Sequence, residues 1–124
     1  MLKKRKNHRA NMAVIEKNTF GISEALIQQV TEKIVRECDP HKVILFGSFA
    51  MGKPRLHSDL DLFVIMDSDL RRDRRTVKIS KLFPRRRFPM DIIVYTPEEV
   101  KNSLTRGNPF IRDILEKGRV LYAR

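Results

Sequence analysis

The sequence predicts a single α/β domain in which helices flank a mixed β-sheet. A chain of 124 residues has the length of one domain and can form one hydrophobic core. Short apolar runs rich in β-branched residues alternate with segments that have the apolar spacing of helices. The 23 residues from Asp67 to Pro89, between the second and third of these runs, are long enough for the crossover that parallel strands require.

Four segments have the caps or the spacing expected of helices. Ser23 is a preferred N-cap residue, and apolar residues follow at intervals of four until Asp39-Pro40 ends the pattern. Thr96 and Glu99 have the spacing of a capping box, with a proline at the first helical position between them. The predicted helices cover about residues 24–38, 70–82, 97–104 and 109–117.

Four apolar runs are predicted to be strands, over residues 42–46, 60–66, 90–95 and 119–122. Gly47-Ser48 ends the first of them, and residues 49–51 are expected to form one turn of helix. A loop containing Gly52 and Pro54 then leads to the second strand. No repeat or linker divides the chain, so we expect these strands to form one sheet.

The net charge of +11 is concentrated in two parts of the chain. Residues 1–20 carry six Lys or Arg against one Glu, and residues 70–87 carry nine against one Asp. We interpret residues 1–21 as a flexible basic N-terminal arm before a domain over residues 22–124, and the second segment as a helix with a solvated basic face. Nucleic-acid binding through these patches is not favoured, because no aromatic residues interleave with the arginines at the spacing that stacked bases need.

Two further features bear on location. No apolar run approaches the roughly 18 residues needed to span a bilayer, and no signal-type apolar segment follows the basic start of the chain. The single cysteine, Cys38, permits no internal disulfide, which suits a reducing compartment. We therefore expect a soluble, cytoplasmic protein without a membrane partner.

Three aspartates stand at the starts of two predicted strands. Asp59 and Asp61 are two residues apart, so they project from the same face of the second strand, and Asp91 has the same position in the third strand. If these two strands are parallel, all three carboxylates meet at one end of the sheet. If the first strand is antiparallel to the second, Gly47-Ser48 lies at that end too. An Asp-x-Asp pair alone is often two solvated loop residues, so the prediction depends on the combination.

Clustered carboxylates repel one another unless a cation neutralises them, and hard divalent cations prefer oxygen ligands. Magnesium is the natural candidate, with phosphate oxygens of a substrate completing its coordination. Gly47 and Ser48 could hold such a phosphate through backbone N–H groups, a hydroxyl and the positive end of a short helix. Lys53 and Arg55 either neutralise phosphate charge or are ordinary surface residues.

Four stretches of the sequence form a recognisable pattern: GSFAMG, SDLDLFVI, MDIIVYTPEE and ILEKGRVLY. Together they closely resemble the minimal nucleotidyltransferases of the DNA polymerase beta superfamily, small proteins often paired with a HEPN-domain partner. The resemblance covers about residues 22–123 and includes the diagnostic order of Gly-Ser, ten residues, Asp-x-Asp and a third aspartate on a later strand. It implies a single nucleotidyltransferase domain of the polymerase beta type.

The resemblance also implies roles for individual residues. In such proteins Asp59 and Asp61 would hold two magnesium ions, and Asp91 would help bind the catalytic metal and activate the attacking hydroxyl. The Gly-Ser pair would hold the nucleotide triphosphate. Many relatives read Gly-Ser-x-Ala-Arg-Gly, whereas Met51 replaces that arginine here, and Lys53 or Arg55 is the candidate substitute.

The function that the resemblance implies is transfer of AMP from ATP to a tyrosine hydroxyl of a HEPN ribonuclease toxin. The protein would then be the antitoxin and would form a hetero-oligomer with the toxin. Two alternatives stay open. One is a nucleotidyltransferase that acts on a small-molecule hydroxyl, such as that of an aminoglycoside. The other is a non-catalytic module that binds the toxin or RNA through its basic patches.

Overall fold

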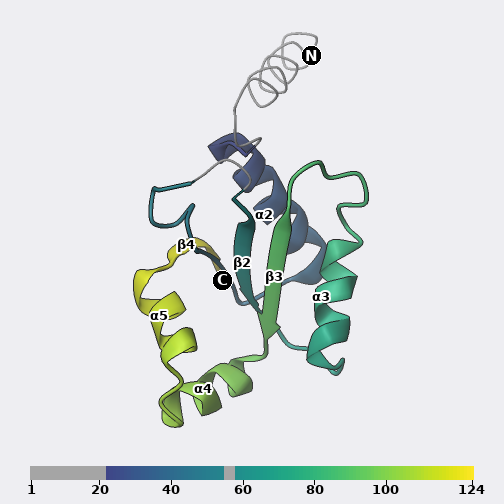
Figure 1. Ribbon diagram of the computed structural model, residues 1–124. Helices are drawn as coiled ribbons and strands as arrows, with labels where there is room; N and C mark the ends of the chain where they lie inside the picture. The colour runs from purple at the N-terminus through teal and green to yellow at the C-terminus, as the bar shows by residue number, and fades with distance from the viewer. Residues whose placement is uncertain (1–21, 55–57) are drawn as a thin grey trace, which may run out of the picture.

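The computed structural model describes residues 22–54 and 58–124, which form helices on both faces of a four-stranded sheet (Figure 1). The elements, in chain order, are α2 (Glu24–Cys38), β1 (Lys42–Phe46), β2 (Leu60–Ile65), α3 (Arg72–Ser80), β3 (Met90–Tyr95), α4 (Pro97–Thr105), α5 (Pro109–Lys117) and β4 (Arg119–Ala123). The predicted α/β class is therefore confirmed. The predicted basic arm over residues 1–21 lies outside the described residues, so the proposed division of the chain stays a prediction.

The strand directions are those that bring the candidate residues together. The strand order is β3-β2-β1-β4, with β1 antiparallel to both β2 and β4, and β2 parallel to β3. Asp61 lies opposite Asp91 in the parallel pair and opposite Phe46 in the antiparallel pair. The end of β1 and the starts of β2 and β3 therefore meet at one end of the sheet.

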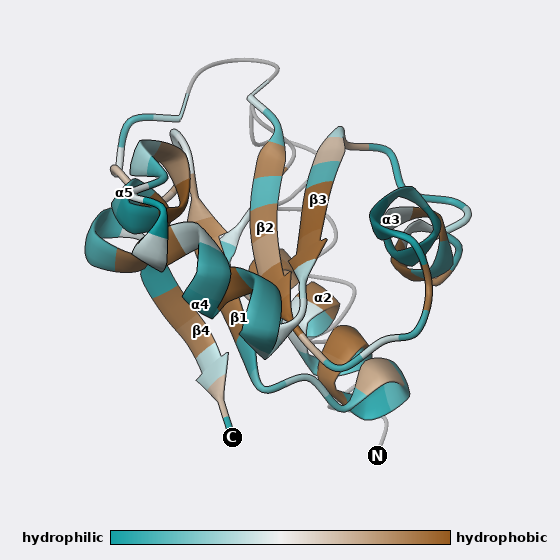
Figure 2. Ribbon diagram, turned by 90° about the horizontal axis from the view of Figure 1, so that it is seen from below, coloured by the Kyte–Doolittle hydropathy of each residue, from teal (hydrophilic) through white to brown (hydrophobic). Residues whose placement is uncertain are grey.

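Side chains of the strands alternate between the two faces of the sheet and pack in two hydrophobic clusters. Figure 2 shows β2 as mostly hydrophobic, with a hydrophilic band near its start. On one face, Leu62 and Val64 of β2 pack in a cluster that includes residues of α2 and α3. On the other face, Phe63 and Ile65 pack with residues of α4 and α5. Both faces of β2 are thus buried, which explains its near-continuous apolar sequence. Polar side chains are therefore confined to the start of this strand.

The helix caps follow the sequence closely. The Ser23 hydroxyl accepts a hydrogen bond from the Leu26 amide at 3.1 Å, and α2 ends at Asp39 in the left-handed conformation. Thr96 and Glu99 form the predicted reciprocal capping box of α4. No helix within the described ranges has both the length and the apolar character needed to cross a bilayer.

Arg75 is an exception to the predicted solvated basic face of residues 70–87. Its side chain is 7% exposed, and its guanidinium donates to the Leu70 and Val94 carbonyls and to both Glu99 carboxylate oxygens. The hydrogen bond from Arg75 holds the pKa of Glu99 below its usual range. One arginine of this segment therefore fastens α3 to β3 and α4, and a neighbouring one, Arg72, stacks over the Tyr95 ring at 4.0 Å.

Candidate active site

The three candidate carboxylates lie at the same end of the sheet. Asp61 and Asp91 are the second residues of β2 and β3 and occupy paired positions in the parallel register, so their backbones are roughly 4.8 Å apart. Both are on the face that carries Phe63 and Ile93 further along the strands. Asp59 precedes β2 by one residue and is exposed, as is Asp91, whereas Asp61 is half-buried.

Electrostatic repulsion links the three groups. Burial, and then the negative charges of Asp91 and Asp59, raise the pKa of Asp61 to about 6. A bound cation would relieve this repulsion. However, in residues 22–54 and 58–124 no three His, Cys, Asp or Glu side chains form a group that could hold a metal ion. Carboxylate oxygens have the right chemistry for Mg²⁺, but other oxygen ligands must complete its coordination.

Gly47 lies directly against the Asp61 carboxylate. Its φ of +76° belongs to the left-handed region that favours glycine, and a Cβ there would collide with Oδ2 of Asp61. Phe46, the residue before it, pairs with Asp61 across the antiparallel register. The Gly-Ser pair of the sequence motif is thus adjacent to the Asp-x-Asp pair in space, although ten residues separate them in the chain.

The single helical turn predicted after Gly47-Ser48 is present only as hydrogen-bonded turns and does not continue into a helix. Residues 48–52 form hydrogen-bonded turns, in which the Met51 amide donates to the Gly47 carbonyl at 3.2 Å and the Lys53 amide donates to the Ser48 carbonyl at 3.0 Å. Gly52 has a φ of +70°, which turns the chain back before a helix can continue. A phosphate bound here would therefore contact backbone amides and the Ser48 hydroxyl without the field of a helix end.

Of the two residues proposed to neutralise phosphate charge, the structure describes Lys53 but not Arg55. Lys53 is exposed, and its backbone is tied to Ser48 by the hydrogen bond above. Arg55 lies outside the described residues, so its role stays a prediction. Met51, which replaces the arginine of many relatives, is 58% exposed.

Helix α5 lies near Gly47, a proximity that the sequence did not predict. A small cavity of about 180 Å³ adjoins this glycine, between the turn and α5. Phe110 packs edge-on against Phe46 at 6.0 Å between ring centroids, and Lys117 pairs with Asp113 at 3.0 Å on the same helix. The sequence predicted a helix over residues 109–117, but nothing in it placed that helix beside the Gly-Ser turn.

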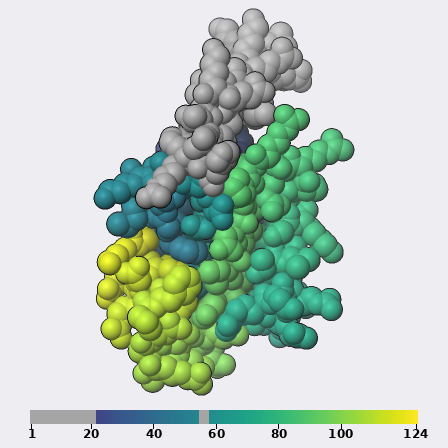
Figure 3. Space-filling view, in the orientation of Figure 1, coloured from purple at the N-terminus to yellow at the C-terminus, as the bar shows by residue number. Residues whose placement is uncertain are grey.

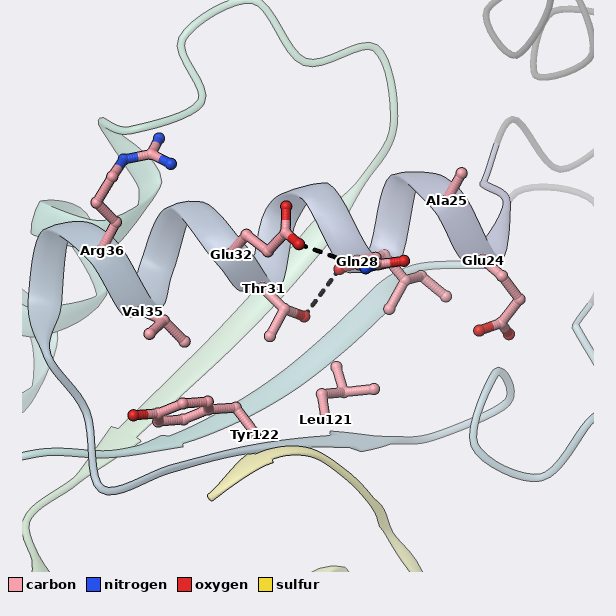
Figure 4. A pocket seen from close by; sticks show the side chains of 10 residues that line it. Glu24, Ala25, Gln28, Thr31, Glu32, Val35, Arg36, Leu121 and Tyr122 are labelled. Atoms are coloured by element: carbon pink, nitrogen blue, oxygen red, sulfur yellow. Dashed lines mark hydrogen bonds between the residues drawn. The ribbon is translucent and has the colours of Figure 1, made fainter. Parts of the chain in front are cut away.

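A wider hollow of about 640 Å³ lies elsewhere, between α2 and β4 (Figure 4). Figure 4 shows Thr31 and Val35 of α2 pointing toward Leu121 and Tyr122 of β4. Three of its polar side chains already form hydrogen bonds within the helix: the Gln28 amide donates to the Glu32 carboxylate, and the Thr31 hydroxyl donates to the Ile27 carbonyl. None of the clustered aspartates lines it, so we place the candidate active site at the carboxylates on the basis of their chemistry.

The chain belongs to the family described as polymerase beta, nucleotidyltransferase, which it matches over residues 28–124. It is 37% identical over 81 residues to the putative protein adenylyltransferase MJ0604 of Methanocaldococcus jannaschii, a match that covers 65% of this chain and 77% of that protein. Its fold resembles the crystal structure of a putative nucleotidyltransferase from Sulfolobus solfataricus, with a TM-score of 0.56, 18% identity and coverage of 81% and 79% of the two chains. The predicted nucleotidyltransferase fold and enzyme class are confirmed.

The raised pKa of Asp61 predicts that Asp61→Asn stabilises the metal-free protein at neutral pH. Below pH 3.8 the carboxyl is protonated in the folded and the unfolded chain alike, so it does not affect their balance. Between pH 3.8 and about 6 the unfolded chain loses its proton first, so the wild-type protein loses stability as the pH rises. Because solvent screens this half-buried group, we expect the variant to gain only about 1 kcal/mol above that range.

Urea unfolding in the presence of EDTA, at about pH 3.5 and about pH 8, measures this difference. Asp69→Asn is the matched control, because Asp69 follows β2 at the opposite end of the sheet and its side chain is exposed. The Asp61 variant should exceed wild type only at the higher pH. An equal gain at both values would contradict the account of repulsion among the three aspartates.

Proposed function

We propose that this protein transfers AMP from ATP, in the presence of Mg²⁺, to a tyrosine hydroxyl of a HEPN ribonuclease toxin and so acts as its antitoxin. The observation that carries the proposal is the register that sets Asp61 beside Asp91, with Gly47 against the Asp61 carboxylate. The family supports nucleotidyl transfer, and the similarity to a putative protein adenylyltransferase supports a protein acceptor and ATP as the donor. We place the reaction in the cytoplasm, in a complex of the two proteins.

Different residues at this end of the sheet would bind the triphosphate of ATP and the magnesium ions. Gly47 and Ser48 would hold the triphosphate of ATP through backbone amides and the hydroxyl, and Lys53 or Arg55 would balance its charge. The three aspartates would hold two magnesium ions together with phosphate oxygens and water. When bound, the ions would supply charge stabilisation for the entering and leaving oxygens.

The reaction is an in-line displacement at the α-phosphorus. The tyrosine oxygen forms a bond to that phosphorus while the bond to the oxygen bridging the α- and β-phosphates breaks, and pyrophosphate leaves with the electron pair. The hydroxyl proton passes to the Asp91 carboxylate, which is exposed at the start of β3 and so accessible to an incoming acceptor. The products are the tyrosine–AMP ester and pyrophosphate, and no serine or cysteine nucleophile takes part.

Calorimetry tests the proposed metal and nucleotide site. We expect Mg²⁺ alone to bind weakly, because the described part of the chain contains no preformed group of three metal ligands. Mg²⁺ with ATP should bind well, because the phosphates supply the missing oxygen ligands. The double variant Asp59→Asn, Asp61→Asn should lose most of this binding and all transfer.

A double variant at the other end of β2 provides the control. Asp67 and Asp69 have the same spacing and are removed in the same way, but they follow the strand instead of preceding it. The control should bind Mg²⁺ and ATP like wild type. Unchanged binding and transfer in the Asp59, Asp61 variant would show that the site is assigned to the wrong residues.

A further inference from the structure

A groove of about 420 Å³ lies between α2 and the segment that leads into β3. We call it the basic groove, and its lining is Leu26, Gln29, Val30, Lys33, Phe83, Pro84, Arg85, Arg86 and Phe88. The apolar members form most of this set, and Phe83 and Phe88 are half-buried against the core. The groove can therefore accept an apolar side chain.

The charges around the basic groove all have one sign. Lys33, Arg85 and Arg86 line it, no carboxylate does, and the exposed Arg87 lies beside it in the chain. Within residues 22–54 and 58–124 none of these four cations takes part in an ion pair, whereas Arg72, Arg75, Arg119 and Arg124 each pair with a carboxylate. The positive charge at the groove is thus left unneutralised by the described part of the molecule.

The basic groove borders the end of the sheet that carries the aspartates. Phe88 precedes Asp91 by three residues, a distance of roughly 10 Å along extended chain. The Leu60 amide donates to the Pro89 carbonyl at 2.9 Å, which ties this segment to the start of β2, next to Asp59. Figure 1 shows the segment rising above the start of β3, and Figure 3 shows the green atoms of this part of the chain projecting at the upper right.

We propose that the basic groove docks an acidic segment of the acceptor protein, with one apolar side chain in the groove and carboxylates on Lys33, Arg85 and Arg86. The inference deepens the proposed function and rests on it in taking the docked segment as part of the acceptor. Charge complementarity selects this occupant. A second copy of the chain, with a net charge of +11, would be repelled. An RNA strand is disfavoured because Phe83 and Phe88 pack against the core instead of standing free to stack on bases.

Fluorescence anisotropy at low ionic strength, without nucleotide, tests the docking. The probe is a fluorescein-labelled peptide of glutamates around one leucine and one tyrosine, and its twin has glutamines for glutamates. The double variant Arg85→Ala, Arg86→Ala should bind the acidic peptide about tenfold more weakly than wild type and with less salt dependence. The control Arg71→Ala, Arg74→Ala removes the same charge from exposed positions at the start of α3 and should change binding less than about twofold.

Each of the following binding results would overturn the docking proposal. Equal weakening by both double variants would show attraction to net charge alone, and equal binding of the glutamine twin, or no saturable binding up to about 1 mM, would rule out acidic recognition. Tighter binding of a short oligouridine that the Arg85, Arg86 variant loses would assign the groove to RNA. Self-association that this variant abolishes would assign it to a second copy. Because the assay contains no nucleotide, loss of transfer with intact peptide binding counts against the proposed function alone.

Discussion

Asp91→Asn is expected to reduce nucleotide transfer by about a thousandfold or more while leaving binding of the acceptor nearly unchanged. Asparagine keeps the size of the side chain, but it has no negative charge to help hold a divalent cation and cannot accept the hydroxyl proton. Asp91 is exposed at the start of β3, so the substitution should not disturb the core. Transfer of labelled AMP to the candidate HEPN acceptor and isothermal titration of the two proteins measure the two effects separately.

Arg85→Ala, Arg86→Ala provides the opposite comparison. This variant should weaken the complex and its salt dependence, but transfer to an acceptor that is already bound should change much less. Full transfer by Asp91→Asn would show that the third aspartate is not part of the site. Full neutralisation of the toxin by the same variant, with no transfer by the wild type, would favour a non-catalytic binding module.

Arg75→Ala is expected to lower the free energy of unfolding by about 3–5 kcal/mol, the largest effect on stability that we predict. The substitution removes the guanidinium that joins α3 to the Leu70 and Val94 carbonyls and to the Glu99 carboxylate. The half-buried Glu99 carboxylate then lacks its main hydrogen-bond donor. The loss of the Arg75 side chain, which is only 7% exposed, also leaves a cavity.

Urea unfolding of Arg75→Ala, Arg75→Met and Arg74→Ala measures this effect. Methionine fills much of the arginine's volume without its hydrogen bonds, so its cost should be smaller than that of alanine. Arg74 is the neighbouring exposed arginine, and its loss should cost less than about 0.5 kcal/mol. Equal stability of the Arg75 and Arg74 variants would contradict the structural role of the buried ion pair.

The parts of the fold that the sequence predicted well are those set by local chemistry. The caps at Ser23 and Thr96 begin helices where they were expected, and β1 and β3 have the predicted bounds. The strand directions were predicted from the candidate site residues. The Gly-Ser turn and the three aspartates lie at one end of the sheet only if the first pair of strands is antiparallel and the second pair is parallel. Both pairs run as predicted.

The parts that the sequence could not predict depend on contacts between distant segments. Arg75 looks like its exposed neighbours in the sequence, and only the packing of α3 on β3 and α4 buries it. The contact between Gly47 and Asp61 needs the register of β1 with β2, which no local signal specifies. One turn of helix was expected at residues 49–51, but Gly52, with its positive φ, reverses the chain before a helix can continue.

Intact mass measurement of a candidate HEPN-domain acceptor tests the central claim most directly. The acceptor is incubated with this protein, Mg²⁺ and ATP labelled in the adenine ring, and its mass and labelled residue are determined. We predict that the acceptor gains the mass of AMP, that the label lies on a tyrosine, and that Asp61→Asn and Asp91→Asn abolish the gain. An unchanged mass, under conditions where wild-type protein binds the acceptor and neutralises it, would contradict the account.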